Sequence, residues 1–215
     1  ARQSAQGGCR APEKTRGQIQ KTQLPEVIKM AEIIPIEIDA PLDAAVRRAA
    51  EVLREGAVIA LPTDTLWGLC AKAGDAEGIE KLYKAKGRED EKGAPVIIGL
   101  MNQLALLTKP LPAKIRENLY ALWPGPLTLI FEAGEEVPPL LAEGGGIAAR
   151  YPAQPLCQAL ARAAGPFAAT SANPPGKAPF ASATEIAAHF GDKISLILDG
   201  GAIEGEAPST VVDLR

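Results

Sequence analysis

The stretch that decides the fold is AVIALPTDTLWGL, residues 57–69. It begins with an uninterrupted apolar run, Ala57–Leu61, which is typical of a β-strand buried on both faces. Thr63, Asp64 and Thr65 follow directly. Because open α/β sheets bind ligands beyond the carboxyl ends of their strands, these hydroxyls and this carboxylate form a first candidate site. An ordinary turn, capped by the same Thr and Asp side chains, remains the alternative from this segment alone.

Outward from this stretch, apolar runs alternate with helical periodicity. We expect Asp39 to cap a helix whose apolar positions run to Leu53 and which Gly56 ends, and Asp75 to cap a helix ending near Gly87. Further helices are expected at 112–122, 155–164 and 182–190, and strands at 33–38, 95–100, 127–131, 146–150, 167–170, 193–198 and 210–214. This alternation predicts an α/β fold with helices packed on a sheet.

Bulk properties restrict the class of protein. The chain has 215 residues, of which 47% are hydrophobic, enough for one α/β domain with a real core. Residues 1–29 are polar and lack periodicity, so we expect a flexible leader followed by a single folded domain at 30–215. No apolar run approaches the roughly 20 residues that cross a bilayer. A net charge of −3 and 4% aromatic residues argue against a protein that coats nucleic acid.

Cysteine and histidine are too scarce for several common chemistries. Cys9, Cys70 and Cys157 lie far apart without C-x-x-C spacing, so neither a disulfide framework nor a protein metal site is expected. The cytoplasm is the simplest location. We interpret Cys70 as a small buried apolar residue. The one histidine, His189, is expected to pack at its helix end, which argues against Ser-His-Asp or Cys-His catalysis.

Several further motifs carry polar or charged groups at the ends of expected elements. Cations in the segment 84–92 either complement a helix dipole or grip phosphate, and Arg88, after a glycine, suits phosphate best. Hydroxyls and an amide in TSAN, residues 170–173, suit a phosphate or sugar, or equally the turn before Pro174. Arg150 ends an apolar run, which suits a carboxylate clamp. Two hydroxyls, Ser209 and Thr210, open the last strand.

Taken together, these segments resemble the YrdC family, which contains the threonylcarbamoyl-adenylate synthases of tRNA modification. The resemblance rests on the order and spacing of the motifs and extends over nearly all of residues 42–214. The motifs, in chain order, are PTDTLWGL (62–69), KGR (86–88), PGPLTL (124–129), AARYP (148–152), TSAN (170–173), LDGG (198–201) and PSTVVD (208–213).

The resemblance implies a twisted mixed sheet flanked by helices, with a concave, positively charged groove. It implies an enzyme that joins L-threonine, bicarbonate and ATP into threonylcarbamoyl-AMP and releases pyrophosphate, with Mg²⁺ held mostly by ATP and water. A partner enzyme would then transfer the threonylcarbamoyl group to tRNA. The family's motifs assign threonine binding to Thr65, Arg150 and Ser209, and ATP binding to Lys86, Arg88, Lys92, Ser171 and Asn173.

The implied chemistry suits these residue types. Carbamate and ATP are both anions, so cations and positioned donors lower the barrier better than a histidine base does. We expect Arg88 and Arg150 to act electrostatically, without a distinct catalytic acid or base.

Two alternatives stay open. The same fold could serve as an RNA-binding module through phosphate contacts, including direct contact with tRNA, although the acidic balance and scarce aromatic residues disfavour this. A different carbamoyl-adenylate chemistry occurs in the YrdC-like domain of hydrogenase-maturation proteins. Those chains usually carry additional acylphosphatase and zinc-finger parts.

Overall fold

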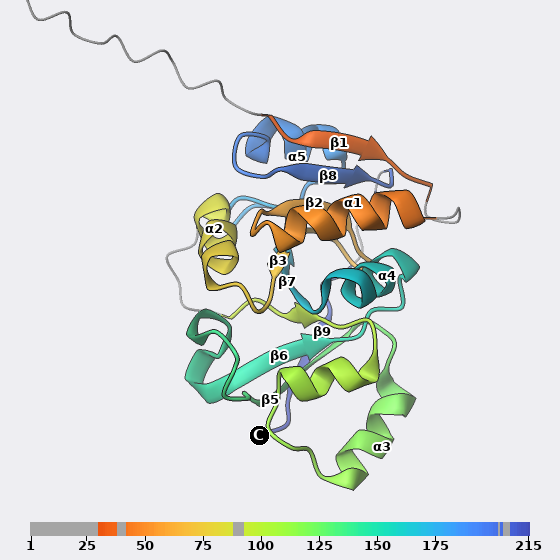
Figure 1. The fold of residues 1–215 in the computed structure, drawn as a ribbon, viewed down its shortest axis with the longest axis vertical. Coiled ribbons are helices and arrows are strands. Elements are labelled where there is room, and N and C mark those ends of the chain that lie inside the picture. Colours follow the sequence, from red (N-terminus) through yellow and green to blue (C-terminus); the bar gives the residue numbers. More distant parts are fainter. Residues whose placement is uncertain (1–29, 38–41, 88–92, 202, 204–206) are drawn as a thin grey trace, which may run out of the picture.

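The computed structural model describes residues 30–37, 42–87, 93–201, 203 and 207–215. Within them, nine strands form one sheet in the order β1-β8-β2-β3-β7-β4-β6-β5-β9, with helices packed against it (Figure 1). The expected α/β class is therefore confirmed. The elements, in chain order, are β1 (Glu32–Pro35), α1 (Asp43–Arg54), β2 (Ile59–Pro62), β3 (Trp67–Lys72), α2 (Ala76–Lys86), β4 (Val96–Ile97), η1 (Met101–Leu106), α3 (Ala113–Leu122), β5 (Leu127–Glu132), η2 (Pro139–Leu141), η3 (Glu143–Gly145), β6 (Gly146–Arg150), α4 (Pro155–Ala164), β7 (Phe167–Ser171), α5 (Ala183–Phe190), β8 (Leu196–Asp199) and β9 (Thr210–Asp213).

The sheet is mixed, as the family resemblance implied. Pairs β1–β8, β2–β8, β4–β6 and β5–β9 are parallel, whereas β2–β3, β3–β7, β4–β7 and β5–β6 are antiparallel. Strands β6 and β7 therefore run in opposite directions on either side of β4. Residues at the ends of these two strands do not share one carboxyl edge, so a site that joins them must extend across the strands.

The strand around Ile59 is buried on both faces, as its apolar run predicts. Ile59 and Leu61 pack with α1 and α4 in one core cluster. Val58 and Ala60 pack on the other side, in a cluster that includes apolar residues of α2 and α5. Side chains of a strand alternate between faces, so five consecutive apolar residues supply both layers. This strand anchors the loop that follows it at the centre of the molecule.

That loop closes a hairpin. Strands β2 and β3 are antiparallel, and Pro62 pairs with Trp67, which leaves residues 63–66 as the connection. The residues after Leu66, which the sequence patterns assign to a motif but not to a strand, form β3 and are almost completely buried.

Most other boundaries agree with the sequence, with a few corrections. The Asp75 side chain accepts a hydrogen bond from the Glu77 N–H and caps α2, which ends at Gly87 in the left-handed conformation as expected. The N-cap of α1 is Leu42, without a side-chain cap, so the helix begins later than an Asp39 cap would place it, and Asp39 itself lies outside the described residues. The expected strand at 95–100 is only two residues long, because η1 begins at Met101.

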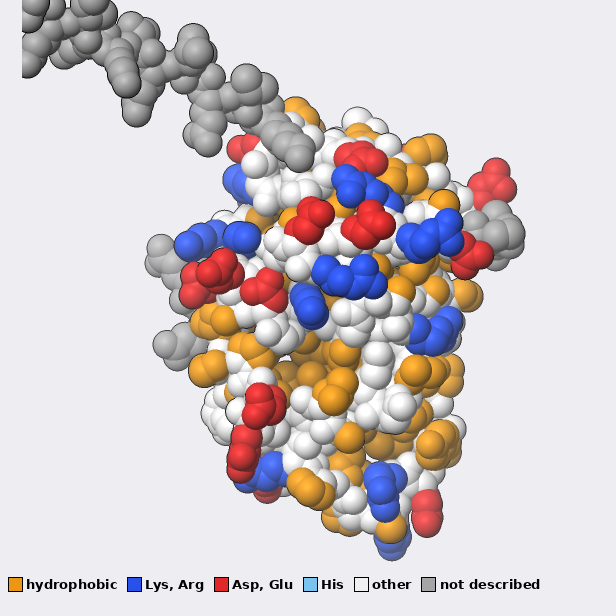
Figure 2. Space-filling view, in the orientation of Figure 1, with side chains coloured by type: hydrophobic (Ala, Val, Ile, Leu, Met, Phe, Trp, Pro, Cys, Tyr) orange, Lys and Arg blue, Asp and Glu red, His pale blue; other side chains and the backbone are white. Residues whose placement is uncertain are grey.

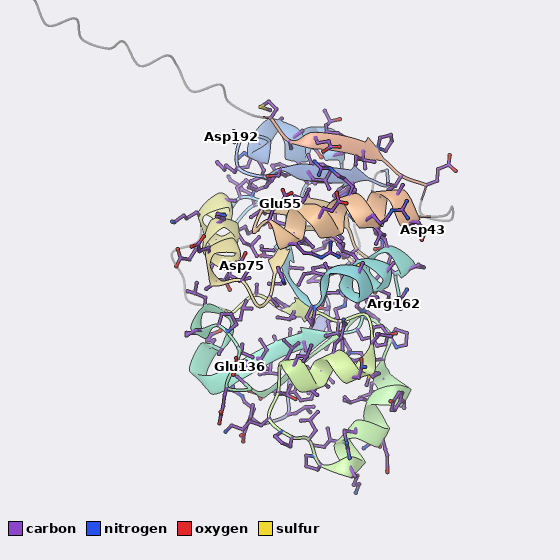
Figure 3. The ribbon with its side chains drawn as sticks, viewed as in Figure 1. Asp43, Glu55, Asp75, Glu136, Arg162 and Asp192 are labelled. Atoms are coloured by element: carbon purple, nitrogen blue, oxygen red, sulfur yellow. The ribbon has the colours of Figure 1, made fainter. Side chains whose placement is uncertain are left out.

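The surface is charged over the helices and apolar around a hollow. On the face that carries α1, basic and acidic side chains alternate, and hydrophobic side chains gather in a depression beside them (Figure 2). Charged residues such as Asp43, Glu55 and Asp192, which are labelled in Figure 3, are exposed. Among the described residues, no helix is long and apolar enough to cross a membrane. The predicted leader at 1–29 lies outside the described residues.

Candidate active site

A cavity of about 300 Å³ crosses the sheet and collects residues from most of the sequence motifs. Four predicted site residues line it: Thr65, Arg150, Ser171 and Ser209. The remaining lining residues are Thr63, Leu66, Trp67, Gly68, Gly93, Pro95, Ile97, Thr128, Ala169, Thr170, Pro208 and Val211. Strands β3 to β7 and the start of β9 therefore all contribute, and the site spans the strands as their directions require.

The hairpin loop is held by one hydroxyl. Thr63 Oγ1 accepts hydrogen bonds from the backbone N–H groups of Thr65 and Leu66, each at 3.1 Å, and donates to the Leu66 carbonyl at 2.7 Å. This is the Thr-capped turn that the sequence analysis kept as the alternative to a binding site. The turn also directs Thr65 into the cavity, so both interpretations apply to the same residues.

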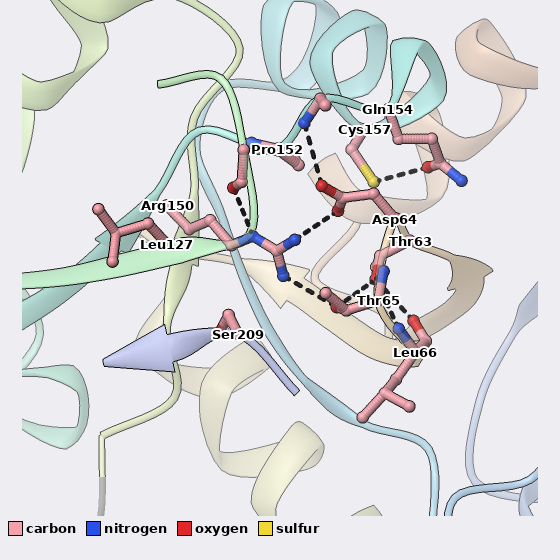
Figure 4. A network of polar contacts seen from close by, with 12 residues as sticks. Thr63, Asp64, Thr65, Leu66, Leu127, Arg150, Pro152, Gln154, Cys157 and Ser209 are labelled. Carbon is pink, nitrogen blue, oxygen red and sulfur yellow. Dashed lines mark hydrogen bonds and ion pairs between the residues drawn. The ribbon is translucent and has the colours of Figure 1, made fainter. Parts of the chain in front are cut away.

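Arg150 is buried at the end of β6, and its guanidinium is held on three sides (Figure 4). Its Nη1 donates to Thr65 Oγ1 at 2.9 Å, and its Nε donates to the Gly125 carbonyl at 3.2 Å. Its Nη2 forms an ion pair with Asp64 Oδ1 at 2.7 Å. Because these partners come from two other motifs, the arginine connects three segments that lie far apart in the sequence.

The pair formed by Arg150 and Asp64 is the main electrostatic feature of the cavity. The two side chains are 6% and 16% exposed, so water screens their attraction little. Neither Nη2 nor Oδ1 has another hydrogen-bond partner within the described residues. The Asp64 carboxylate also acts on a neighbouring thiol: burial raises the pKa of Cys157 above its usual value, and the charge of Asp64 raises it further.

A second polar cluster lies beside the cavity at the end of β7. Lys86 is 4% exposed, and its Nζ donates to the carbonyls of Ser171 at 2.5 Å and Asn173 at 2.6 Å, as well as to the Asn173 side chain. The Ser171 hydroxyl donates to Asn173 Oδ1 at 2.6 Å. Asn173 Nδ2 in turn donates to the carbonyls of Pro174 and Lys177. Lys86 therefore fixes the turn that carries the predicted nucleotide-binding residues.

A second cavity adjoins the first. It has a volume of about 490 Å³ and shares Leu66, Trp67, Ser171 and Pro208 with its neighbour. Its other lining residues are mostly apolar: Ala178, Pro179, Phe180, Ala181 and Ile203. Trp67 lies between the cavities and is 1% exposed, and within the described residues its indole N–H has no hydrogen-bond partner. The two cavities therefore share part of their walls, and we call the first, which Thr65, Arg150 and Ser209 line, the polar compartment and the second the apolar compartment.

The structure brings together six of the eight predicted site residues, in the cavity or in the Lys86 cluster next to it. The other two, Arg88 and Lys92, lie outside the described residues, so the positive charge of the groove stays a prediction. Sequence reasoning gave no role to Thr128, whose hydroxyl shares a 2.8 Å hydrogen bond with Ser209. It also gave none to Gly125, whose carbonyl binds Arg150. Their motif, residues 124–129, was the available signal.

Two further expectations concern Cys70 and His189. Cys70 is fully buried as a small apolar residue, and His189 packs against Phe180 and Phe190 at its helix end, both as expected. Within the described part of the chain, no group of three His, Cys, Asp or Glu side chains is arranged to hold a metal ion.

Comparison with known proteins gives consistent matches. A family model of Sua5, YciO and YrdC, described as "Telomere recombination", matches residues 51–215. A protein of Halorhodospira halophila named threonylcarbamoyl-AMP synthase is 36% identical over 79% of this chain and 90% of its own length. Pyrococcus abyssi Sua5, solved with L-threonine, has a TM-score of 0.79 at 36% identity and is matched over 85% of this chain. Escherichia coli YciO has a TM-score of 0.77 at 28% identity, over 86% of this chain and 91% of its own.

These proteins differ in how much of their length the chain accounts for. The chain spans nearly all of the Halorhodospira protein and of YciO, but only 54% of the solved Pyrococcus chain. The shared part contains every element that lines the cavity from β3 onward.

Proposed function

The chain belongs to the Sua5–YciO–YrdC family, and from this premise we propose that it is an L-threonylcarbamoyladenylate synthase. The observation that carries the proposal is the cavity in which Thr65 and Arg150 are hydrogen-bonded at 2.9 Å and which Ser171 also lines. The name of the Halorhodospira relative and the threonine bound to Pyrococcus Sua5 support the substrates.

The reaction joins three substrates. The amine of L-threonine attacks the carbon of bicarbonate, and loss of water gives a carbamate. A carbamate oxygen then attacks the α-phosphorus of ATP, the bond to the bridging oxygen breaks, and pyrophosphate leaves with the electron pair. Both reactants carry negative charge, so the enzyme contributes mainly positioning and electrostatic stabilisation.

Threonine occupies the polar compartment. Among the described residues that line this cavity, Arg150 supplies the positive charge. Its guanidinium suits the carboxylate of threonine or of its carbamate. The Thr65 hydroxyl lies beside the guanidinium and contacts the same substrate. Ser209, fixed by Thr128, closes the compartment from β9. A volume of about 300 Å³ accommodates an amino acid of this size.

ATP extends from the apolar compartment to Ser171, a residue that lines both compartments. The apolar compartment, with Phe180 and Pro179 in its wall, suits a nucleobase. Ser171 and Asn173, on the turn that Lys86 fixes, contact the nucleotide. The family resemblance adds Lys86, Arg88 and Lys92 as the cations that hold the phosphates. The α-phosphorus would then lie near the threonine compartment, as attack by the carbamate requires.

Mg²⁺ enters with ATP as part of the substrate. Asp64, the carboxylate next to the cavity, is already paired with Arg150, and the described residues offer no cluster of metal ligands. The phosphates and water would therefore supply most of its coordination, which suits the octahedral preference of Mg²⁺. The adenylate then serves a partner enzyme, which transfers the threonylcarbamoyl group to tRNA.

The test is a substrate-omission assay. Purified chain is mixed with MgATP, bicarbonate and L-threonine, pyrophosphate release is followed, and the new adenylate is identified by mass spectrometry. The proposal predicts that release stops when any one substrate is omitted, and that threonine is used better than serine or valine. Pyrophosphate release that is independent of threonine, or no adenylate under any condition, contradicts the proposal.

A further inference from the structure

Asp64 joins three segments of the site through one carboxylate. Its Oδ1 pairs with Arg150 Nη2 at 2.7 Å, and its Oδ2 accepts a hydrogen bond from the Ala153 N–H at 3.1 Å (Figure 4). Asp64 lies in the hairpin loop, Arg150 ends β6, and Ala153 precedes α4. A rotation of the carboxylate would lose both contacts at once, so its orientation is fixed from two sides.

The contacts of Arg150 leave few of its donors free. A guanidinium has five N–H groups. Its Nε donates to Gly125, its Nη1 donates to Thr65, and its Nη2 is buried against Asp64. One N–H of Nη1 and one of Nη2 remain, and because Nη2 is buried, the donor left for an anion in the cavity is the second N–H of Nη1, next to the Thr65 hydroxyl. Asp64 determines which donor is left, because its ion pair holds Nη2 away from the cavity.

An arginine without this partner would behave differently. The Arg150 side chain is 6% exposed, and a buried cation needs a neutralising partner. Without Asp64, only the hydrogen bonds to Thr65 and Gly125 would restrict the many rotamers of this long side chain. Asp64 supplies both the neutralising charge and the third point of attachment, at Nη2. The ion pair is not exposed to solvent competition in the way that the surface pairs are.

We propose that Asp64 is a positioning residue, which fixes the plane of the Arg150 guanidinium so that Nη1 and Thr65 Oγ1 face the substrate together. The inference rests on the proposed function for its kinetic consequences. Asp64 itself does not contact the reacting atoms. Its removal should therefore weaken the use of threonine and leave the use of ATP nearly unchanged.

Steady-state kinetics of Asp64→Ala and Asp64→Asn test the consequence. We expect the threonine KM of Asp64→Ala to rise about tenfold or more, as for loss of a hydrogen bond to a charged group. The ATP KM should change by less than about twofold, because the Lys86 cluster is untouched. Asp64→Asn keeps the shape and one acceptor oxygen, so it should recover part of the loss. A merely structural role would instead raise both KM values together.

The matched control is Glu132→Gln. Glu132 forms a 3.0 Å ion pair with Lys109 in which both side chains are about 60% exposed, and neither residue lines the threonine compartment. Its loss should leave both KM values unchanged, since exposed pairs contribute little. An equal rise of the threonine KM in the control would show that any lost ion pair has this effect.

A second measurement does not depend on activity. The side-chain ¹⁵N–¹H NMR signals of Arg150, assigned by their loss in Arg150→Lys, report the restricted rotation of the guanidinium. They should be resolved in the wild-type protein and averaged or broadened in Asp64→Ala, or in Asp64→Asn if the alanine variant does not fold. Unchanged Arg150 signals overturn the inference, and so does an unchanged threonine KM in an active protein. If the wild type forms no adenylate, the proposed function fails, and the NMR result alone decides the positioning role.

Discussion

Arg150 Nη1 donates a hydrogen bond to Thr65 Oγ1 at 2.9 Å, although 85 positions separate the two residues in the chain. Thr65 lies in a hairpin loop and Arg150 at the end of a strand on the other side of β3, β7 and β4. The contact joins two of the three residues that the family resemblance assigns to threonine. It is the geometric reason to treat them as one binding unit.

Removal of the Thr65 hydroxyl should affect threonine and not ATP. In Thr65→Val the shape is nearly kept, but Arg150 loses an acceptor and the substrate loses a hydroxyl partner. We expect kcat/KM for threonine to fall about tenfold or more, in the range for a hydrogen bond to a charged group. Pyrophosphate release at varied threonine measures this. Thr184→Val, at an exposed position of α5, is the control, and an equal loss there would contradict the assignment.

Lys86 offers a sharp comparison with Lys84 on the same helix. Lys86 is buried and binds the turn at Ser171 and Asn173, whereas Lys84 is 80% exposed and pairs only weakly with Glu80. Lys86→Met should raise the ATP KM about tenfold or more, because both carbonyls lose a charged donor and the phosphates a cation. Lys84→Met should behave like the wild type. Equal ATP KM values in the two variants would refute a nucleotide role for Lys86.

The buried thiols should be inert in the native protein. Burial raises the pKa of both Cys70 and Cys157, so neither forms the reactive thiolate near neutral pH. Iodoacetamide should modify these two residues only after unfolding, as peptide mass spectrometry can establish. Rapid labelling of Cys157 in the folded protein would show that the packing of α4 on the hairpin is wrong.

The pair at the end of β9 predicts a defined pH dependence. Hydrogen bonds from Arg215 lower the pKa of Asp213 to about 2. A lowered native pKa stabilises the folded state above the pKa of the unfolded chain, about 3.9. That contribution is lost as the pH falls through 2. NMR titration of the Asp213 carboxyl should show the low midpoint, and Arg215→Ala should return it towards 3.9. An unchanged midpoint in this variant would contradict the contact.

Sequence patterns predicted the elements better than their connections. The run at 57–61 indicated a buried strand because its periodicity is local, and Asp75 and Gly87 marked both ends of α2 by their side-chain and backbone chemistry. The strand Trp67–Lys72 was missed because its polar turn looked like the start of a loop. Asp39 was a plausible cap by residue type, yet the helix begins at Asp43, close to the first apolar positions that pack on the sheet.

The site shows the same division. Motif order and resemblance selected Thr65, Arg150, Ser171 and Ser209, and they share one cavity. Their partners could not be derived in that way. The contact of Asp64 with Arg150 depends on how the loop of the β2–β3 hairpin reaches β6, with β7 and β4 between them in the sheet. No local sequence pattern encodes this arrangement.

Threonine-dependent pyrophosphate release by Arg150→Lys tests the central claim most directly. Lysine keeps the charge but cannot bind Asp64, Thr65 and Gly125 at once, since only the planar fork of arginine reaches three partners. The account predicts that this variant folds and loses about a hundredfold in kcat/KM for threonine, as for a charged hydrogen bond at the upper end of its range. The control Arg116→Lys, at an exposed position of α3 that does not line the cavity, should keep the wild-type value. Wild-type turnover by folded Arg150→Lys would contradict it.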